Sequence, residues 1–423
     1  MKKSLLTLLT TAIVSTTALG QAVIGGKQTI TVNNQSTHQT ISHCGTHQCD
    51  HTRECPLPDD STLRKMAARM LMVGFKGDTI KKDNPVIGYV RDLGVGAIIL
   101  FDVDLTGAKT VGSRNITSRG QLQKLTADLR ALAGDRKLLI AADQEGGLVQ
   151  RLKPRYGFTK IPTARYIGQV ANDDTTRYYA SVMARELAES GVNVNLAPET
   201  DIHRADCPVI GGLDRAFATD PDSVARFAAL TIDEMGKQGV TCVLKHFPGH
   251  GSATSDSHYG LTDVTATWDS TELVPFKRLI DGGYNGMIMT AHIFNRQLDE
   301  EYPATLSRKM LTEVLREKLG FKGVILTDDM YMQGIIDNYA IEDAIVAAIN
   351  AGADMMCMGN NITTGFEADR PAKVVDIIVK AVKEGRIPVQ RIIEANARIE
   401  KLREWRVESG EWRVVDNPLE GTH

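Results

Sequence analysis

The sequence lacks an excess of charge of either sign, and it has no long run of lysine or arginine. Its 423 residues include 49 lysines and arginines against 52 aspartates and glutamates, which gives a formal net charge of −3 at pH 7. Proteins that bind nucleic acid neutralise phosphates with a concentrated basic surface. The composition therefore argues against nucleic acid as the main partner and favours a small neutral or polar ligand.

Long hydrophobic runs are missing beyond the N-terminus. The one mostly apolar stretch, residues 5–19, is shorter than the roughly 20 residues that a membrane-spanning helix needs. Lys2 and Lys3 precede it and small residues follow it, a pattern typical of a secretory signal peptide. No cysteine comes directly after it, so a lipid anchor is not indicated. We expect residues 1–22 to be a signal peptide and the protein to be exported, periplasmic or secreted, without stable membrane association; an uncleaved anchor is the alternative.

Cysteine is sparse, with six copies in two groups. Cys207, Cys242 and Cys357 lie in the body of the chain, where the last two fall in apolar runs typical of buried thiols. The others lie in residues 23–58, a polar segment that we predict to be a flexible linker because it has too few apolar residues for a core. It contains His38, His43, Cys44, His47, Cys49, His51 and Cys55. These side chains could bind zinc or copper, but we prefer a disordered tether with an adventitious disulfide.

A glycine-rich phosphate loop after the first apolar run is also absent, which argues against a dinucleotide-binding open sheet. The sequence instead repeats one pattern, in which an amphipathic helix ends at glycine and a short apolar run follows. Glycine suits the left-handed end of a helix, and short continuous apolar runs suit strands that are buried on both faces of a parallel sheet. The eight runs are residues 71–75, 97–101, 138–142, 192–197, 240–244, 287–292, 324–328 and 353–358.

Eight strands that alternate with helices favour a (β/α)8 TIM barrel of the α/β class. We place this single domain at residues 59–405 and a C-terminal tail at residues 406–423. In such barrels, functional side chains collect after the C-terminal ends of the strands. Six polar clusters follow the third to the seventh runs, namely Asp143–Arg151, Arg215, Lys245–Gly251, Asp256–His258, His292 and Asp328–Asp329. We therefore expect their side chains to share one pocket.

The clusters contain groups suited to covalent catalysis. A buried carboxylate that faces a proton donor across a small pocket fits covalent displacement with proton transfer. His258 lies two residues after Asp256, a spacing that can let the carboxylate accept a hydrogen bond from the imidazole and raise its basicity. Other charged residues in the clusters can bind ligand hydroxyl groups through charge-assisted hydrogen bonds. Metal-dependent barrels often carry His-x-His on an early strand, and residues 71–75 lack this motif, so we expect no metal.

Three motifs closely resemble those of glycoside hydrolase family 3. They are Lys-His-Phe-Pro-Gly-His-Gly from Lys245 with Asp-Ser-His from Asp256, Asp-Gln-Glu-Gly-Gly from Asp143, and Thr-Asp-Asp from Thr327. The first is specific to the single-barrel β-N-acetylglucosaminidase branch of the family, and the resemblance runs from about residue 61 to about residue 400. It implies a retaining exo-β-N-acetylglucosaminidase (a β-N-acetylhexosaminidase) that forms a covalent glycosyl-aspartate intermediate and needs no cofactor.

The resemblance also implies roles for individual residues. Asp328 would be the nucleophile and His258 the acid/base, assisted by Asp256. The sugar at the non-reducing end would be bound by Asp143, Arg151, Arg215, Lys245 and His246. A histidine thus replaces one of the two carboxylates that retaining glycosidases usually employ. For Asp329 we expect a capping or supporting role.

The implied partner is a small carbohydrate, and the implied enzyme is a monomer. The sugar would be the terminal N-acetylglucosamine of peptidoglycan fragments or of chitin oligosaccharides. Both sources stay open, because family members that cleave peptidoglycan fragments are often cytoplasmic whereas this chain is expected to be exported. Three alternative functions also remain: another exo-glycosidase of the family, such as a β-glucosidase; a phosphorylase in which phosphate replaces water; and a non-catalytic sugar-binding barrel.

Overall fold

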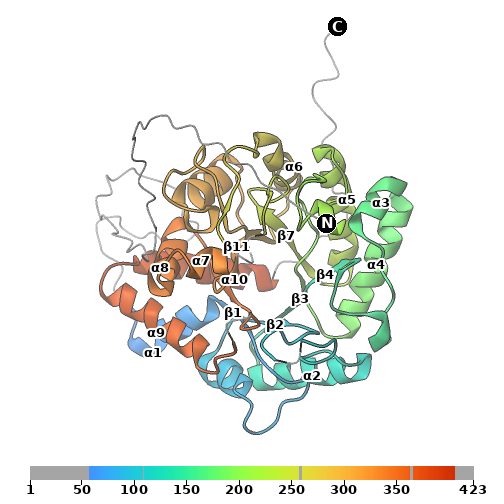
Figure 1. Ribbon diagram of the computed structural model, residues 1–423. Helices are drawn as coiled ribbons and strands as arrows, with labels where there is room; N and C mark the ends of the chain where they lie inside the picture. Colours follow the sequence, from blue (N-terminus) through green and yellow to red (C-terminus); the bar gives the residue numbers. More distant parts are fainter. Residues whose placement is uncertain (1–56, 108, 257–259, 363–364, 405–423) are drawn as a thin grey trace, which may run out of the picture.

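The computed structural model describes residues 57–404 except residues 108, 257–259 and 363–364 (Figure 1). The predictions for the signal peptide, for the histidines and cysteines of residues 38–55, for the C-terminal tail and for His258 lie outside the described residues. Among the described helices, none has the length and apolar character that crossing a membrane requires.

Eight parallel strands of the described chain form a closed barrel (Figure 1). They are β1 (Leu71–Gly74), β2 (Ala97–Leu100), β3 (Leu139–Ala142), β6 (Val194–Asn195), β7 (Thr241–Phe247), β9 (Met287–Thr290), β11 (Val324–Asp329) and β12 (Met355–Met358). Each pairs with the next barrel strand along the chain, and β12 closes the barrel against β1 with Met72 opposite Cys357. The predicted (β/α)8 barrel is therefore confirmed, and each of the eight apolar runs contributes one strand.

Helices surround the barrel (Figure 1). The α-helices are α1 (Asp60–Arg69), α2 (Arg119–Ala133), α3 (Ala164–Val170), α4 (Asp173–Glu189), α5 (Pro221–Lys237), α6 (Val274–Asp281), α7 (Gln333–Ile336), α8 (Ile341–Ala351), α9 (Arg370–Lys383) and α10 (Val389–Glu404). The π-helices are η1 (Gly88–Leu93) and η6 (Lys309–Lys318), and the short 3-10 helices are η2 (Pro154–Tyr156), η3 (Gly211–Leu213), η4 (Ser270–Leu273) and η5 (Ala304–Leu306). Polar residues define several helix starts; Asp220, for example, accepts a hydrogen bond from the Ser223 N–H at the start of α5.

Apolar side chains between strands and helices form the core. Strands β1, β2, β3, β9 and β12 are buried at every residue, as expected for strands that are covered on both faces. Cys242 and Cys357 are buried free thiols, as predicted, and Cys207 is another. A barrel interior that is filled in this way leaves the ends of the strands as the place for a ligand.

The strand pairing is irregular at the ends of two strands. The register between β7 and β9 shifts between Leu244 and Phe247, and the register between β11 and β12 shifts between Leu326 and Asp329. Such irregularities change the direction in which side chains point. The two segments contain Lys245, His246 and Asp328. Two small sheets lie outside the barrel, β4 (Gln144–Gly146) with β5 (Val149–Gln150) and β8 (Thr262–Asp263) with β10 (Ile293–Phe294).

Candidate active site

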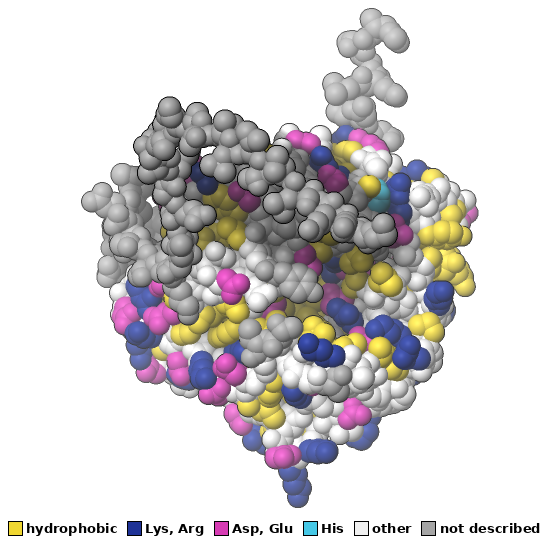
Figure 2. Space-filling model, in the orientation of Figure 1, with side chains coloured by type: hydrophobic (Ala, Val, Ile, Leu, Met, Phe, Trp, Pro, Cys, Tyr) yellow, Lys and Arg dark blue, Asp and Glu magenta, His cyan; other side chains and the backbone are white. Residues whose placement is uncertain are grey.

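A cavity of about 410 Å³ lies at the C-terminal ends of the barrel strands, with lining residues at or after seven of these ends. Seven of the eight predicted site residues line it, namely Asp143, Arg151, Arg215, Lys245, His246, Asp256 and Asp328. The eighth, His258, lies outside the described residues. On the face seen in Figure 2, acidic and basic side chains lie side by side among apolar ones. The structure therefore brings the predicted residues together, while their roles in a reaction remain predictions.

Asp143, directly after β3, binds two cations. Its Oδ1 lies 3.0 Å from Lys245 Nζ at the end of β7, and its Oδ2 lies 3.1 Å from Arg151 Nη2. Burial alone would raise the pKa of Asp143, but the positive charges of Lys245 and Arg151 outweigh burial and hold this pKa well below its ordinary value. Asp143 therefore stays ionised and can accept hydrogen bonds from ligand hydroxyl groups.

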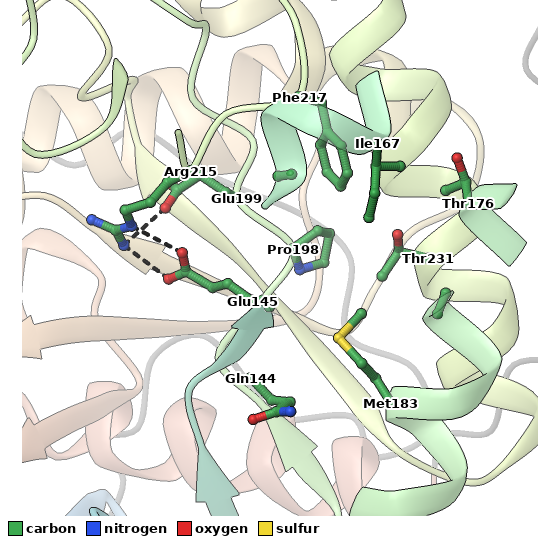
Figure 3. A pocket seen from close by; sticks show the side chains of 13 residues that line it. Gln144, Glu145, Ile167, Thr176, Met183, Pro198, Glu199, Arg215, Phe217 and Thr231 are labelled. Carbon is green, nitrogen blue, oxygen red and sulfur yellow. Dashed lines mark hydrogen bonds and ion pairs between the residues drawn. The ribbon is translucent and has the colours of Figure 1, made fainter. Parts of the chain in front are cut away.

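Arg215 is held by two glutamates. Its Nε and Nη2 lie 2.9 and 2.8 Å from the two carboxylate oxygens of Glu145, and Nη2 also lies 2.9 Å from Glu199 Oε2 (Figure 3). Glu145 Oε1 in turn lies 2.6 Å from Lys245 Nζ. Paired contacts of this kind fix both the position and the plane of a guanidinium group. Arg215 is therefore pre-positioned at the wall of the cavity.

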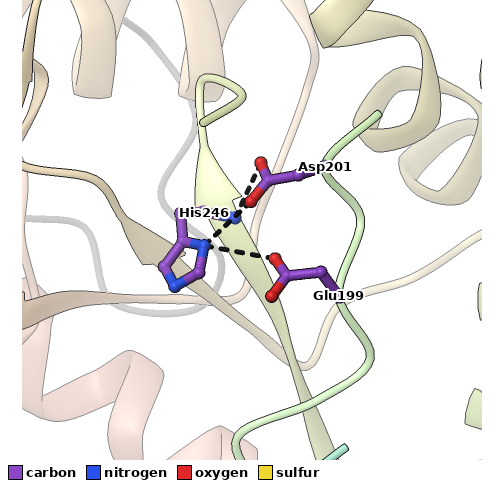
Figure 4. A group of neighbouring side chains, drawn as sticks. All are labelled: Glu199, Asp201 and His246. Carbon is purple, nitrogen blue, oxygen red and sulfur yellow. Dashed lines mark hydrogen bonds and ion pairs between the residues drawn. The ribbon is translucent and has the colours of Figure 1, made fainter. Parts of the chain in front are cut away.

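His246 contacts two carboxylates through one ring nitrogen. Its Nδ1 lies 2.9 Å from Asp201 Oδ2 and 3.1 Å from Glu199 Oε1 (Figure 4). Burial opposes a charge on His246, but the carboxylates of Glu199 and Asp201 outweigh it and raise the pKa of His246 to about 10. Burial and the charge of Glu199 raise the pKa of Asp201 to about 7. These directions fit an imidazolium beside an ionised Glu199 and an Asp201 that takes up a proton more easily than an ordinary aspartate.

Among the described residues, these three side chains also have the chemistry and the spacing to hold a metal ion. One ligand atom from each lies within 4.8 Å of the others. The distances within the group, however, are those of ordinary hydrogen bonds and ion pairs, and Arg215, which also pairs with Glu145, lies 2.9 Å from Glu199. The charges of the group are thus balanced by protein side chains. The expectation that the enzyme needs no metal remains a prediction.

Two adjacent aspartates end β11, and the structure separates their environments. Asp329 accepts the N–H of Tyr331 on Oδ1 and the N–H of Gly359 on Oδ2, each at 3.0 Å, so it ties β11 to the segment after β12. Burial, opposed by these hydrogen bonds, raises the pKa of Asp329 to about 6. Both aspartates line the cavity, but Asp328 accepts a single backbone hydrogen bond among those recorded, from the N–H of Asp329 to its Oδ1 at 2.7 Å. This arrangement favours Asp328 over Asp329 as the attacking carboxylate.

His292 and His250 have surroundings different from that of His246. Both are buried, and neither is among the residues that line the cavity. His292 Nδ1 lies 2.8 Å from Thr305 Oγ1, and Nε2 lies 3.0 Å from the carbonyl oxygen of Asp329. The ring therefore links the end of β9 to the end of β11. His250 packs beside His246, with 5.7 Å between the ring centres.

Sequence reasoning missed several charged residues of the site. Glu199 and Asp201 fix predicted residues, as does Glu145, which lay within a predicted cluster but received no role, and Asp102 after β2 pairs with Lys153. All but Lys153 lie within a few residues of the C-terminal end of a barrel strand. The rule that located Asp143 and Lys245 would have flagged them as well. What the sequence does not reveal is which of them contacts which partner.

Comparisons with known proteins identify the family to which the chain belongs. The family model described as Glycosyl hydrolase family 3 N terminal domain matches residues 62–402. A Beta-hexosaminidase from Tolumonas auensis is 39% identical over 296 residues, which are 69% of this chain and 83% of the relative. Another, from Photobacterium profundum, is 35% identical over 328 residues, which are 75% of this chain and 91% of the relative.

Solved structures give the same result. A glycoside hydrolase family 3 beta-N-acetylglucosaminidase from Paenibacillus sp. superposes with a TM-score of 0.72 and 31% identity, covering 81% of this chain; this chain spans only 62% of that protein. A Beta-N-acetylhexosaminidase from Beutenbergia cavernae gives a TM-score of 0.71 and 28% identity, covering 81% of this chain and 98% of the other. The barrel, the cavity at its strand ends and these matches together establish that the chain belongs to glycoside hydrolase family 3.

Proposed function

We propose that the protein is a retaining exo-β-N-acetylglucosaminidase that removes terminal β-N-acetylhexosamine residues from the non-reducing end of a carbohydrate. The observation that carries the proposal is one cavity that contains Asp328 at the end of β11, Asp256 on the loop after β7 and the ion pairs around Asp143. Relatives named Beta-hexosaminidase, at 39% and 35% identity over most of their length, support the same activity.

The reaction proceeds by two displacements at one carbon. A carboxylate oxygen of Asp328 attacks the anomeric carbon, the bond to the leaving oxygen breaks, and His258 gives that oxygen a proton. A water molecule then attacks the same carbon, His258 takes its proton, and Asp328 departs with the bonding electrons. Two inversions leave the configuration unchanged. The role of His258 rests on its motif, and the position of Asp256 at the cavity, two residues earlier on the same loop, supports it.

Charged side chains bind the sugar that is removed. Asp143 accepts hydrogen bonds from hydroxyl groups, whereas Lys245 and Arg151 donate them to hydroxyl oxygens. Because the two cations flank Asp143, each is already oriented before the sugar arrives. Binding therefore spends little free energy on ordering these side chains.

Hydrolysis of two substrates tests the activity. We expect the protein to release p-nitrophenol from the β-N-acetylglucosaminide much faster than from the β-glucoside, and to release the sugar first as its β-anomer, as seen by proton NMR. A preference for the β-glucoside, or release of the α-anomer, would contradict the proposal. The same assay in phosphate buffer, with analysis for N-acetylglucosamine 1-phosphate, shows whether water or phosphate is the acceptor.

The biological substrate and the compartment form a further part of the proposal. We propose that the sugar comes from peptidoglycan fragments or chitin oligosaccharides, and that a monomeric enzyme acts on it outside the cytoplasm. The basic and then apolar N-terminus supports export. Kinetics on chitobiose and on an N-acetylglucosamine–anhydro-muropeptide distinguish the two sources. Cell fractionation, N-terminal sequencing of the purified protein and light scattering test the compartment, the cleavage and the monomer.

A further inference from the structure

Hydrogen bonds and ion pairs hold the two acidic residues beside His246 in place. Besides contacting Nδ1, Asp201 accepts the backbone N–H of His246 at 3.2 Å and that of His250 at 2.7 Å, both on Oδ1. Glu199 is held from its other side by Arg215 at 2.9 Å. The side chains of Glu199 and Asp201 are about 1% and 0% exposed. Two buried carboxyl groups therefore enclose one edge of the imidazole, Asp201 through a hydrogen bond and Glu199 at ion-pair distance.

The opposite edge of the ring faces away from the two carboxyl groups. In Figure 4 both carboxylates lie on the Nδ1 side of His246, and the second ring nitrogen points away from them. His246 lines the cavity, whereas Glu199 and Asp201 do not. A neutral imidazole has one N–H, and with that N–H between two carboxylates its Nε2 would be an acceptor. A charged imidazolium donates from both nitrogens.

The charges around the ring favour the imidazolium. The charged or titratable groups around it are Glu199, Asp201, Arg215, Lys245, Glu145 and His250, with Asp143, Asp256 and Asp328 lining the same cavity. The positive charges of Lys245 and Arg215 are each paired with Glu145, while no described cation stands between His246 and its two carboxylates. His250 stays neutral, because burial and the charge of His246 lower its pKa to about 3.

We propose that Glu199 and Asp201 are positioning residues that hold His246 as an imidazolium, with its Nε2–H directed into the cavity to donate to a hydroxyl oxygen of the bound sugar. The inference rests on the proposed function for the identity of that ligand. A ring that can only donate requires a sugar oxygen that accepts. Such a ring also cannot take a proton from water, so His246 cannot replace His258 as the general base.

Nuclear magnetic resonance of histidine-15N-labelled protein measures the protonation directly, without substrate. His246→Gln identifies the signal. We expect both ring nitrogens of His246 to stay protonated from pH 6 to pH 8 in the natural protein, and the ring to lose one of its two protons between pH 6 and pH 8 in Glu199→Gln and Asp201→Asn. Glu145→Gln is the matched control, because it removes a carboxylate from Arg215 without touching His246. A neutral His246 in the natural protein at pH 7 would overturn the inference, even if no variant folds.

Binding of N-acetylglucosamine, measured by calorimetry, tests the consequence. We expect Glu199→Gln and Asp201→Asn to weaken binding roughly 10- to 100-fold at pH 8, the size expected for a hydrogen bond to a charged group, and to recover part of it at pH 6. Asp354→Asn removes a buried carboxylate at the other end of the barrel, so it should alter thermal stability without this pH dependence. Equal losses at both pH values would overturn the inference. If His246 is charged but the natural protein binds no N-acetylglucosamine, the proposed function fails instead.

Discussion

Buried charges in the cavity lie against partners of opposite sign, and the cost of removing one partner depends on how deeply the pair is buried. The side chains of Lys245 and Glu145 are each 3% exposed, and Lys245 also contacts Asp143. Removing one member of a buried pair leaves an unpaired charge without water, which typically costs about 3–5 kcal/mol. Exposed pairs contribute far less.

Lys245→Met should therefore destabilise the protein by about 3 kcal/mol or more, because two carboxylates lose their shared cation. Lys277→Met is the matched control, since Lys277 pairs with Asp281 on the surface of α6 with side chains 44% and 45% exposed. The control should change stability by less than about 1 kcal/mol. Urea unfolding of the three proteins measures both values, and similar losses in the two variants would refute the pairing argument.

Asp328→Ala should abolish turnover of p-nitrophenyl β-N-acetylglucosaminide while leaving the fold intact. The reason is that no other described carboxylate at the end of β11 can replace it, since Asp329 binds two backbone N–H groups. Asp329→Asn should mainly lower the melting temperature, because an amide cannot accept both hydrogen bonds equally. Near-normal turnover in Asp328→Ala would end the assignment of the nucleophile.

His258→Ala separates proton donation from attack. Nitrophenolate leaves without a proton, whereas the alcohol of a natural glycoside needs one. We expect the first displacement on the natural disaccharide to slow far more than the same step on the nitrophenyl substrate. Pre-steady-state measurements of the two substrates provide the comparison, and equal losses would argue against an acid role.

Some site residues could be predicted from the sequence and others could not. The difference is whether a residue is marked by its position and motif or only by its contacts in the folded protein. Asp143, Lys245 and Asp328 could be found because they directly follow apolar runs and belong to recognisable motifs. Glu199 and Asp201 were missed, although they also follow a run, because their importance lies in contacts with His246 and Arg215. Sequence position places a side chain at a strand end; it does not give its partner.

At the scale of elements, the barrel closes where β1 meets the segment after β12, and a glycine makes this contact possible. A Cβ atom added to Gly74 would lie 1.8 Å from the carbonyl oxygen of Gly359, a distance no side chain can tolerate. Gly359 also donates its N–H to Asp329. The close approach therefore links barrel closure to the end of β11.

Gly74→Ala should destabilise the protein by at least about 1–3 kcal/mol. The added methyl group would collide with the backbone of Gly359, which cannot move away without separating β1 from the end of β12. Gly120→Ala on α2 is the control, since its Cβ would meet nothing within 4 Å and alanine favours a helix by about 0.5–1 kcal/mol. Calorimetric melting should show a lower temperature for the first variant and an equal or higher one for the second. A stable Gly74→Ala protein would mean that the strands separate easily.

The elements themselves were the most predictable part. Period and composition located all eight strands because strands buried on both faces must be continuously apolar. The local register shifts in β7 and β11 were not predictable, since they depend on pairing with neighbours and not on residue type. These shifts occur at Lys245, His246 and Asp328, so the least predictable geometry coincides with the candidate site.

For the molecule as a whole, closing parallel strands into a ring brings their C-terminal ends together, and acidic groups are thereby crowded at one end. Glu272 of η4 is one of them, buried to 1% exposure, with Ser252 donating a hydrogen bond to its carboxyl group. Burial, and then the charge of Asp201, raise the pKa of Glu272 from 4.5 to about 8. This end of the barrel should therefore make stability depend on pH.

The sign of that dependence follows from linkage. A carboxyl group whose pKa is higher in the folded protein stabilises the fold fully below pH 4.5, and this stabilisation is lost as the pH rises through about 8. Glu272→Gln keeps an acceptor for Ser252 and cannot ionise. Its free energy of unfolding, relative to that of the natural protein, should therefore rise between pH 5 and pH 9, by an amount on the order of 4 kcal/mol at the limit, and its melting temperature should rise with it. Glu313→Gln makes the same chemical change at an exposed residue and should give a constant difference. If the stability difference between Glu272→Gln and the natural protein also stayed constant with pH, the prediction would be wrong. Ionised Glu272 would then gain water or a cation in the folded protein.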